Sequence, residues 1–531
     1  MEAEIQGRQG LPHLDESMTR GRDVQRGERR KTVETLLIRA DANTEIGTGH
    51  LMRCLALAQA WQAQGMRTTF LSHCPSPALR RRVRTEGARF VSLKDAHPNP
   101  ADLHTTLRLI ETLKPDWLAI DGYHFDPEYQ KAARAAGVRM LAIDDMAHWP
   151  KYHADIVLNQ NLGAEKLHYH CDRDTRLLLG TRYVLLRTEF LKRRGRERET
   201  PREARKVLVT MGGSDPDNVT LKVIRALERV PVEGLEVTIV LGASNPHRAA
   251  LQVAVRSARL QSRGHRIHLV RNTLNMPELM AWADTAVAAG GSTCWELAHA
   301  GVPSLVLVLA DNQTMVADAL DRAGVARKTV VSRLSADISA LLADEGRRRA
   351  MRELGLRTVD GAGAERVVVG LRAAELTLRR ARLDDSRLVW EWRNDSQARA
   401  ASFSSEVIPL HTHEQWFRNH VSSPTDFFYV ALNSGDQPIG QVRFTVRGDE
   451  AVVSVGIARE ARGRGYGAPL ILRGSRQCFA DSRVESIQAY VKPGNTRSLR
   501  AFQKAGYAEA GTTVQKGQRA LRLMARREDF V

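Results

Sequence analysis

Residues 36–64, LLIRADANTEIGTGHLMRCLALAQAWQAQ, contain a short apolar strand, a turn with two glycines and a largely apolar helix, in that order. Apolar strands and amphipathic helices continue to alternate after this stretch. Such alternation is typical of a parallel sheet that helices cover on both faces. The sequence therefore predicts a doubly wound α/β domain over residues 34–190, with further strands at residues 68–72, 117–121, 140–144 and 155–158.

The same pattern restarts after a charge-dense stretch that has no apolar stripe, which predicts a linker over residues 191–205. Residues 207–211 form an apolar strand that runs into the turn Gly212-Gly213-Ser214-Asp215. Because this region repeats the order of the first, a second doubly wound domain is predicted over residues 206–375. Its other expected strands lie at residues 237–241, 267–270, 286–289 and 304–308, and amphipathic helices fill residues 335–375.

The pattern changes again after Thr377. Longer and more widely separated strands follow, which predict an α+β domain over residues 376–531. Residues 1–33 are polar and mixed in charge, without apolar periodicity, and predict a disordered tail. A chain of 531 residues leads us to expect roughly three to four domains, and these patterns indicate three folded units.

The composition is basic, with 79 Lys and Arg against 61 Asp and Glu and a formal net charge of +18. An excess of this size suits nucleic acid, an anionic membrane or a phosphorylated small molecule. No aromatic-interleaved basic patch accompanies the charge, so we expect no nucleic-acid partner. We also expect no membrane partner, because no apolar run is long enough to span a bilayer and no stretch resembles a signal peptide.

The five cysteines show neither a CxxC pair nor regular spacing, which argues against a disulfide framework and against a zinc site. A reducing cytoplasm fits this usage best. No other metal motif is evident, since His168-Tyr169-His170 has the character of a surface loop. We therefore expect a cytoplasmic protein without a metal.

A first group of candidate site residues lies between the first strand and the first helix: Gly47, Gly49 and His50. This is the carboxyl edge of a parallel sheet, where ligands bind in such folds. Glycines there let the backbone approach a substrate, and a helix N-terminus favours anions. His50 suits general-base work on water. Alternatively, His50 caps the helix and the glycines only make the turn.

A second group follows the strands of the second domain. Gly213 and Ser214 offer backbone amides to a pyrophosphate, although a plain tight turn explains them equally well. Glu296, one turn inside the helix that Gly291, Ser292 and Thr293 open, is placed to accept hydrogen bonds from both hydroxyls of a ribose. The alternative is a solvent-facing Glu296. Two further candidates for the sugar, Asn312 and Gln313, follow the next strand at the same edge.

The most specific local motif is Arg462-x-x-Gly465-x-Gly467, which follows a strand and opens an apolar helix. Successive amides around glycines at a helix N-terminus form a nest for a pyrophosphate. The spacing differs from the GxGxxG of a dinucleotide fold, and no downstream ribose carboxylate is present. The candidate anion-binding residues of this loop are Ile457, Arg462, Gly463, Arg464, Gly465, Tyr466 and Gly467.

The motif RAD-x5-GTGH-x2-R at residues 39–53 resembles the N-terminal signature of the UDP-2,4-diacetamido-2,4,6-trideoxy-β-L-altropyranose hydrolases of the pseudaminic acid pathway. Segments 120–123, 143–146 and 159–161 resemble that family's strand-end motifs, whereas Gly122 and residues 146–149 depart from it. The resemblance covers about residues 35–370 and implies two GT-B-like domains. It implies a UDP-sugar site that includes Arg53 and Glu296, with His50 as the base and with Tyr123 and Asn312 positioning substrate or water.

The Arg462–Gly467 loop resembles the acyl-CoA loop of the GNAT N-acetyltransferases, and residues 491–507 resemble the strand, helix and aromatic turn that follow it. This resemblance implies acetyl-CoA as co-substrate, with Asn495 and Ser498 near its pantetheine arm. Phe502 departs from the family, because a tyrosine often stands there as the acid for the thiolate. Either Tyr507, another group or water would then replace that acid, or protonation of the thiolate is not needed.

Residues 390–395 resemble acetyltransferases that modify an amino group on nucleotide-linked sugars, so Trp392 and Arg393 are candidates to face the substrate, or else form a core edge. The sequence offers three candidate bases for the amine and singles out none of them: Glu406, His411 and His413.

These resemblances predict a bifunctional enzyme of pseudaminic acid biosynthesis. The C-terminal domain would acetylate the 4-amino group of a UDP-linked sugar with acetyl-CoA, and the first two domains would hydrolyse UDP from the product. One alternative is a GT-B glycosyltransferase that uses a UDP-sugar donor and is fused to an acetyltransferase. A second alternative is a non-catalytic UDP-sugar or nucleic-acid binding protein with a vestigial acetyltransferase.

Overall fold

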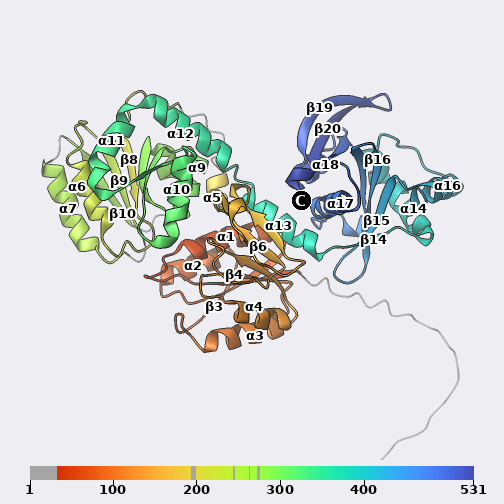
Figure 1. Cartoon of the computed structure of the whole chain (residues 1–531), viewed down its shortest axis with the longest axis horizontal. Coiled ribbons are helices and arrows are strands. Elements are labelled where there is room, and N and C mark those ends of the chain that lie inside the picture. The colour runs from red at the N-terminus through yellow and green to blue at the C-terminus, as the bar shows by residue number, and fades with distance from the viewer. Residues whose placement is uncertain (1–32, 193–198, 243–244, 262–263, 272–274, 531) are drawn as a thin grey trace, which may run out of the picture. The chain divides into compact units, whose positions relative to one another are not determined.

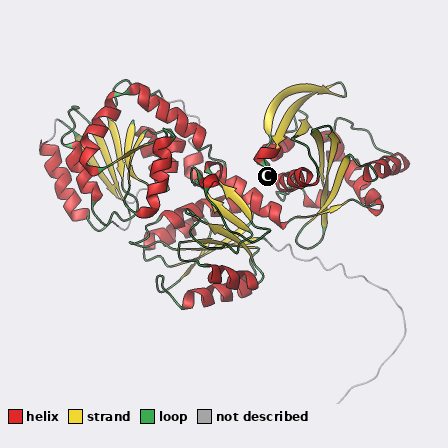
Figure 2. Cartoon of the chain, in the orientation of Figure 1, coloured by secondary structure: helices red, strands yellow, loops and turns green. Residues whose placement is uncertain are grey.

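Three separate β-sheets organise the chain (Figure 1). The computed structural model describes residues 33–192, 199–242, 245–261, 264–271 and 275–530. The predicted tail therefore lies outside the described residues except for Val33, and so do residues 193–198 of the predicted linker. Within the described residues, helices flank the first two sheets (Figure 2). Buried apolar side chains fill the space between these helices and the sheets.

The first sheet is parallel throughout, with strand order β3-β2-β1-β4-β5-β6-β7. Its central strands are apolar along most of their length because both faces are buried, which is typical of parallel sheets. Helix α1 is buried around most of its circumference for the same reason. The strands are β1 (Thr35–Ala40), β2 (Arg67–Ser72), β3 (Arg89–Ser92), β4 (Trp117–Asp121), β5 (Arg139–Ile143), β6 (Ile156–Asn159) and β7 (Arg176–Leu179), and the helices are α1 (Gly49–Gln62), α2 (Pro77–Thr85), α3 (Ala101–Leu113), α4 (Pro127–Ala135) and α5 (Thr188–Leu191).

The second sheet repeats this arrangement, with strand order β10-β9-β8-β11-β12-β13, and all its pairs are parallel. In both sheets the strand order reverses beside the first strand, which opens a crevice at the carboxyl edge. The strands are β8 (Lys206–Thr210), β9 (Glu236–Leu241), β10 (Arg266–Arg271), β11 (Thr285–Ala289), β12 (Ser304–Leu307) and β13 (Arg327–Thr329), and the helices are α6 (Val219–Leu227), α7 (Arg248–Gln261), α8 (Met276–Trp282), α9 (Thr293–Ala300), α10 (Thr314–Arg322), α11 (Leu334–Ala343) and α12 (Glu345–Thr358).

Helix α13 (Gly363–Glu375) follows the second sheet in the chain but packs on the first. Val367, Val368 and Leu371 share a buried cluster with Leu36 and Ile38 of β1. The predicted domain 206–375 therefore ends on a helix that completes the core of the preceding domain. An amphipathic pattern shows which face of a helix is buried but not which sheet buries it.

The third sheet is mixed, with strand order β14-β15-β16-β17-β18-β20-β19, and β19 and β20 form a curved hairpin (Figure 2). Two doubly wound parallel units followed by an α+β unit confirm the predicted fold class. The strands are β14 (Thr377–Arg380), β15 (Asp426–Leu432), β16 (Pro438–Arg447), β17 (Glu450–Ile457), β18 (Ser486–Val491), β19 (Ala508–Gln515) and β20 (Gln518–Arg526), and the helices are α14 (Ser386–Asn394), α15 (Ser396–Ala401), α16 (Leu410–Val421), α17 (Gly467–Asp481) and α18 (Thr496–Lys504).

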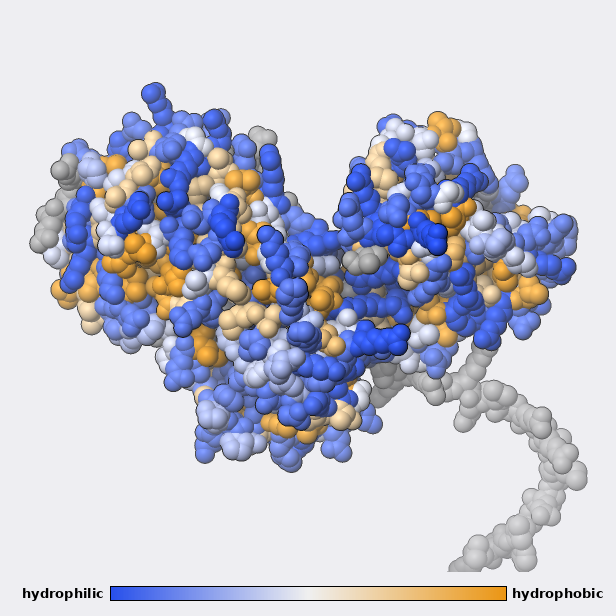
Figure 3. Space-filling view, in the orientation of Figure 1, coloured by the Kyte–Doolittle hydropathy of each residue, from blue (hydrophilic) through white to orange (hydrophobic). Residues whose placement is uncertain are grey.

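The face of the molecule shown in Figure 3 is mainly hydrophilic, with smaller apolar areas between the hydrophilic residues. Within the described ranges, no helix combines the length and the apolar character needed to cross a lipid bilayer.

Candidate active sites

His50 lies in the first turn of α1 and is nearly buried, at 8% exposure. Its Nδ1 atom is 2.6 Å from Oδ1 of Asp121, the last residue of β4. Burial by itself would raise the pKa of Asp121, but the adjacent Arg53 and His50 hold that pKa well below its usual range. A permanently ionised carboxylate therefore orients the imidazole.

Arg53 lies one turn further along α1 and holds two carboxylates in place. Its guanidinium donates to both oxygens of Asp121, each at 2.7 Å, and to those of Asp145 at 2.8 and 3.0 Å. The sequence predicted that Arg53 contacts the UDP-sugar. In the structure its buried side chain connects Asp121 at the end of β4 with Asp145, two residues after β5, and this network orients His50.

Tyr123 and Asn312, the other two predicted catalytic residues, contact each other. Tyr123 donates its hydroxyl proton to Oδ2 of Asp145 at 2.8 Å and accepts a hydrogen bond from Nδ2 of Asn312 at 3.0 Å. Its ring meets the His50 ring edge-on, with centroids 5.1 Å apart. Asn312 follows β12, so a loop of the second sheet meets the His50 site of the first.

The predicted glycine loops meet at the same place. A Cβ atom added at Gly213 would lie 3.0 Å from side-chain atoms of Thr48, the residue that precedes α1. A Cβ atom at Gly49 would lie 3.5 Å from Oγ of Ser292, at the start of α9. A side chain at position 213 would require Thr48 to shift by a few tenths of an ångström, so glycine suits this close approach. Gly47 and Gly291 have no atom within 4 Å of such a Cβ, which leaves open space beside the backbone.

Glu296 does not face solvent, so the alternative of a solvent-facing helix residue at this position is excluded. Its side chain is 13% exposed and pairs with Arg187 at 3.0 Å. Burial raises the pKa of Glu296, and the charge of Arg187 opposes this rise. Gln313 accepts hydrogen bonds from the backbone of Gly290 and Leu309 through Oε1, so it ties two strand-end loops together. Ser214 and Thr293 are half-buried beside these loops.

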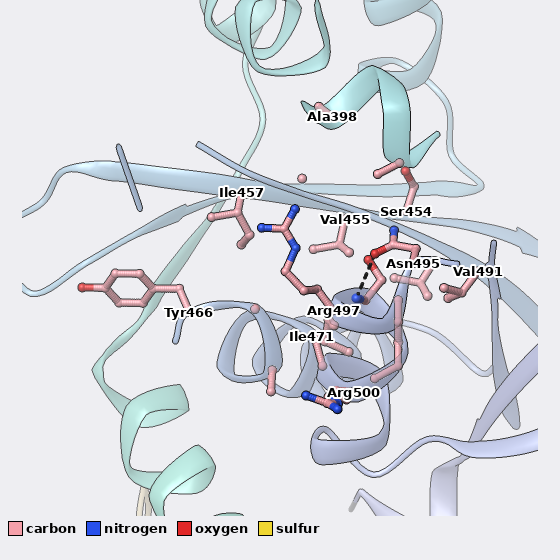
Figure 4. Close-up of a pocket in the computed structure, with 18 of the residues that line it drawn as sticks. Ala398, Ser454, Val455, Ile457, Tyr466, Ile471, Val491, Asn495, Arg497 and Arg500 are labelled. Atoms are coloured by element: carbon pink, nitrogen blue, oxygen red, sulfur yellow. Dashed lines mark hydrogen bonds between the residues drawn. The ribbon is translucent and has the colours of Figure 1, made fainter. Parts of the chain in front are cut away.

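With the exception of Arg464, the predicted acetyl-CoA residues line one pocket of about 1060 Å³, whose lining also includes Glu365 and Arg372 of α13 (Figure 4). The Arg462 side chain does not project freely into this pocket. Its Nε donates to the Ile457 carbonyl at 3.1 Å, and an Nη group pairs with Asp395. These bonds hold the loop, whose glycines Gly463 and Gly465 have positive φ angles of 73° and 76°.

Strands β17 and β18 pair only from Glu450 to Val452 and then separate. The backbone of β17 from Val453 to Ile457 therefore has no strand partner on that side and lines the pocket. An opening between two strands of this kind admits an extended amide-containing arm such as pantetheine. Asn495 caps α18 by accepting from the Ser498 amide at 3.2 Å, the dashed contact in Figure 4.

Phe502 also lines the pocket, whereas Tyr507 packs behind it in the core. The Tyr507 hydroxyl bonds to Ser475 at 2.8 Å, and burial raises its pKa. Tyr507 is thus poorly placed to protonate a thiolate. Tyr490 on β18 lines the pocket instead, with its hydroxyl donating to Gln488 at 2.7 Å.

Several candidates for the acceptor side have structural roles. Trp392 packs in the core of the third unit, and His413 is fully buried, with Nε2 2.9 Å from the carbonyl oxygen of Ser386. Arg393 stacks on Trp416 at 3.9 Å. His411 and Glu406 are exposed and are not among the residues that line the pocket.

The sequence did not single out several residues of these sites. Asp121 and Asp145 end apolar strands, and a search for carboxylates at strand ends finds both of them. No local sequence pattern marks the other residues, because only tertiary packing brings them to the sites: Arg187, His420, Arg443 and Arg372. No group of three or more His, Cys, Asp or Glu side chains within the described part is arranged to hold a metal ion.

Two domain models match parts of the chain. Residues 375–508 match the acetyltransferase (GNAT) domain, and residues 207–357 match the glycosyltransferase family 28 C-terminal domain. The solved structure of MurG from Acinetobacter baumannii is 17% identical and covers 64% of this chain and 99% of that chain, with a TM-score of 0.46.

Two relatives carry the name UDP-2,4-diacetamido-2,4,6-trideoxy-beta-L-altropyranose hydrolase. The one from Campylobacter jejuni is 27% identical over 37% of this chain and 67% of its own length. The one from Helicobacter pylori, named also as a pseudaminic acid cytidylyltransferase, is 26% identical over 43% of this chain and 40% of its own length. The chain spans 55% of the length of an uncharacterized relative from Methanocaldococcus jannaschii, at 25% identity over 51% of this chain.

An aminoglycoside N(6')-acetyltransferase type 1 from Klebsiella pneumoniae is 26% identical over 29% of this chain and 85% of its own length. The relatives and the matched domains together support the predicted fusion. The chain thus joins a region similar to the altropyranose hydrolases of the pseudaminic acid pathway to a C-terminal region similar to the GNAT acetyltransferases.

Proposed function

We propose that the first two units hydrolyse UDP from UDP-2,4-diacetamido-2,4,6-trideoxy-β-L-altropyranose, with His50 as general base. The contact between His50 and Asp121 carries this proposal. A proton on Nδ1 donated to the ionised Asp121 leaves the Nε2 lone pair as the acceptor. Nε2 then takes a proton from water, the water oxygen bonds to the anomeric carbon, and UDP leaves with the electron pair of the broken bond.

Tyr123 and Asn312 position the substrate or the water in this scheme. Both belong to the hydrogen-bonded network that contains Asp145 and Arg53, so their side chains are held in fixed orientations. The loop amides around Gly213, Gly291 and Ser292 receive the diphosphate, and Glu296 receives the ribose. Fixed donors of this kind stabilise the charge on departing UDP.

The third unit acetylates the 4-amino group of the UDP-linked precursor with acetyl-CoA. The Arg462–Gly467 loop receives the pyrophosphate of the co-substrate, and the opening between β17 and β18 receives its arm. Acetylation supplies the second acetamido group that the hydrolase substrate contains. The two reactions are therefore successive steps.

Incubation of the full chain with acetyl-CoA and the UDP-4-amino sugar tests both reactions. We expect free CoA, UDP and the diacetamido sugar, identified by mass spectrometry. If none of these three products forms, the proposal is wrong. Salt-sensitive nucleic-acid binding without consumption of CoA would instead favour a binding protein.

A glycosyltransferase is the second candidate, because residues 207–357 match a glycosyltransferase C-terminal domain. A hydrolase releases UDP when water is the only acceptor, and His50→Ala abolishes that release. A glycosyltransferase releases UDP at a comparable rate only when a sugar acceptor is added.

A further inference from the structure

Strand β16 presents a cationic stripe to the acetyltransferase pocket. Arg443, Thr445 and Arg447 alternate along the strand and all line the pocket. Val442 and Phe444, which flank Arg443 on the strand, are fully buried in the core on the opposite face. Because side chains alternate between the faces of a strand, this register directs three polar groups at one ligand space.

A second layer of positive charge lies behind Arg443. The Trp416 ring is flanked by Arg393 at 3.9 Å and by Arg443 at 5.0 Å. Burial and the like charge of Arg443 lower the pKa of Arg393 to about 10, which still leaves Arg393 charged at neutral pH. Asp426 is the facing carboxylate, 3.9 Å from Arg443, and it already bonds to Thr445 and His420.

The charge of the pocket lining as a whole is positive. Among the described residues that line it, Glu365 is the only carboxylate, and it pairs with Lys504 at 2.5 Å. Lys516, in the turn between β19 and β20, adds a further cation to the lining of the pocket. A polycationic amine meets repulsion in such a pocket, whereas an amine that carries phosphates is attracted.

The stripe is separate from the acetyl-CoA loop. Arg443 pairs in register with Ser454, and Thr445 pairs with Val452. The loop begins after Ile457, so these positions lie about 10 and 17 Å from it along β17, at roughly 3.4 Å per residue. One pocket thus has two cationic ends, and the pyrophosphate of acetyl-CoA accounts for only one.

We propose that Arg443 and Arg447, supported by Arg393 and Lys516, form an anion subsite that holds the diphosphate of the amine acceptor. The inference rests on the proposed acetylation of a UDP-linked amine and specifies how that amine is selected. It also distinguishes this chain from its relative that is named for an aminoglycoside, since aminoglycosides are polycations.

Initial rates of CoA release by the full chain test the subsite. We expect Arg443→Gln and Arg447→Gln each to raise the KM for the UDP-4-amino sugar by about tenfold, because each removes a charge-assisted contact to phosphate. The KM for acetyl-CoA should stay within about twofold. Arg387→Gln is the matched control, since Arg387 is exposed on α14 and pairs only with Glu391 of its own helix. Acceptor KM values equal to that of the control would overturn the subsite.

Calorimetric titration with UDP keeps the test independent of turnover. We expect two UDP molecules per wild-type chain, one in the hydrolase-like site and one in the subsite. The double variant Arg443→Gln/Arg447→Gln should lose the UDP bound in the subsite. Glu296→Ala should weaken binding of the UDP in the hydrolase-like site. A single UDP per chain that the arginine variants leave unchanged overturns the subsite. Two UDP molecules without any acetylation of the UDP-4-amino sugar retain the subsite and reject the proposed acceptor.

Kanamycin and spermidine serve as polycationic acceptors in the same assay. We expect rates at least about tenfold below that of the UDP-4-amino sugar. Comparable rates with either amine would contradict selection by charge.

Discussion

Individual residues of the hydrolase-like site derive their chemistry from buried charge. Asp121 is fully enclosed, and Arg53 keeps it ionised. Loss of Arg53 would leave the buried carboxylates of Asp121 and Asp145 without their shared arginine partner, and removing one partner of a buried ion pair costs about 3 to 5 kcal/mol. The orientation of His50 therefore depends on residues that do not themselves meet the reacting atoms.

Asp121→Asn should lower the rate of UDP release by about 10- to 100-fold, because the amide no longer fixes the tautomer of His50. Acetyl transfer by the same preparation is the internal control, since it takes place in the third unit. Wild-type UDP release by Asp121→Asn would rule out an orienting role for the carboxylate.

At the scale of secondary-structure elements, α13 connects two cores. Its apolar face completes the first sheet, while Arg372 reaches the acetyl-CoA loop. The guanidinium donates to the Arg464 carbonyl, lies 4.6 Å from the Tyr466 ring centroid and pairs with Glu34 at 3.1 Å. A helix of the first unit thus helps to hold a loop of the third.

Arg372→Gln should raise the KM for acetyl-CoA by about three- to tenfold, because the loop loses a charged hydrogen bond to its backbone. Acetyl-transfer kinetics measure this effect, and UDP release should stay unchanged. Arg366→Gln, on the same helix but paired with Asp360, provides the control. Equal KM values for the two variants would show that α13 does not support the loop.

Glu375, the last residue of α13, gives this junction a pH dependence. Burial and the charge of Glu34 raise the pKa of Glu375 to about 7. Because its pKa is higher in the folded state, Glu375 contributes to the free energy of unfolding when it is protonated. This contribution is complete below the pKa of the unfolded chain, about 4.3, and is lost as the pH rises through about 7. The loss is about 3 kcal/mol by this linkage.

Glu375→Gln should remove that loss while still accepting the hydrogen bond from Trp117. The melting temperature of the variant should exceed that of wild type by a few degrees more at pH 8 than at pH 5. Glu353→Gln, at an exposed position, controls for the change in net charge. A pH-independent difference in melting temperature would contradict the assignment.

At the scale of the whole molecule, two ligand sites with different chemistry share one chain. Both proposed substrates carry a diphosphate, which a net charge of +18 attracts over long range. In the proposed scheme, the acetylated product of the third unit becomes the substrate of the first two units.

His50→Ala in the full chain should separate the two steps. CoA release should continue at about the wild-type rate, while UDP release falls by at least about 100-fold. The acetylated UDP-sugar should accumulate and be detectable by mass spectrometry. Absence of this intermediate together with normal UDP release would contradict the assigned order.

The sequence alone predicted the three folded units and most of their central strands, because buried parallel strands are continuous apolar runs. In the two parallel sheets it predicted no strand at β3, β7 or β13, which are short and lie at sheet edges where one side is unpaired, and in the third sheet it predicted none at β14, β19 or β20. It also predicted the loops that carry His50, Gly213, Glu296 and Gly465, since glycines and strand ends are local features.

Only the tertiary structure decided what those residues contact. It joined Tyr123 to Asn312 across 189 positions of the chain, paired Glu296 with Arg187 and carried α13 back to the first sheet. It also aligned Arg443 and Arg447 on one face of the acetyltransferase pocket. Local patterns determine which elements form, whereas partners distant in sequence are chosen by the packing of complementary apolar surfaces and the pairing of buried charges.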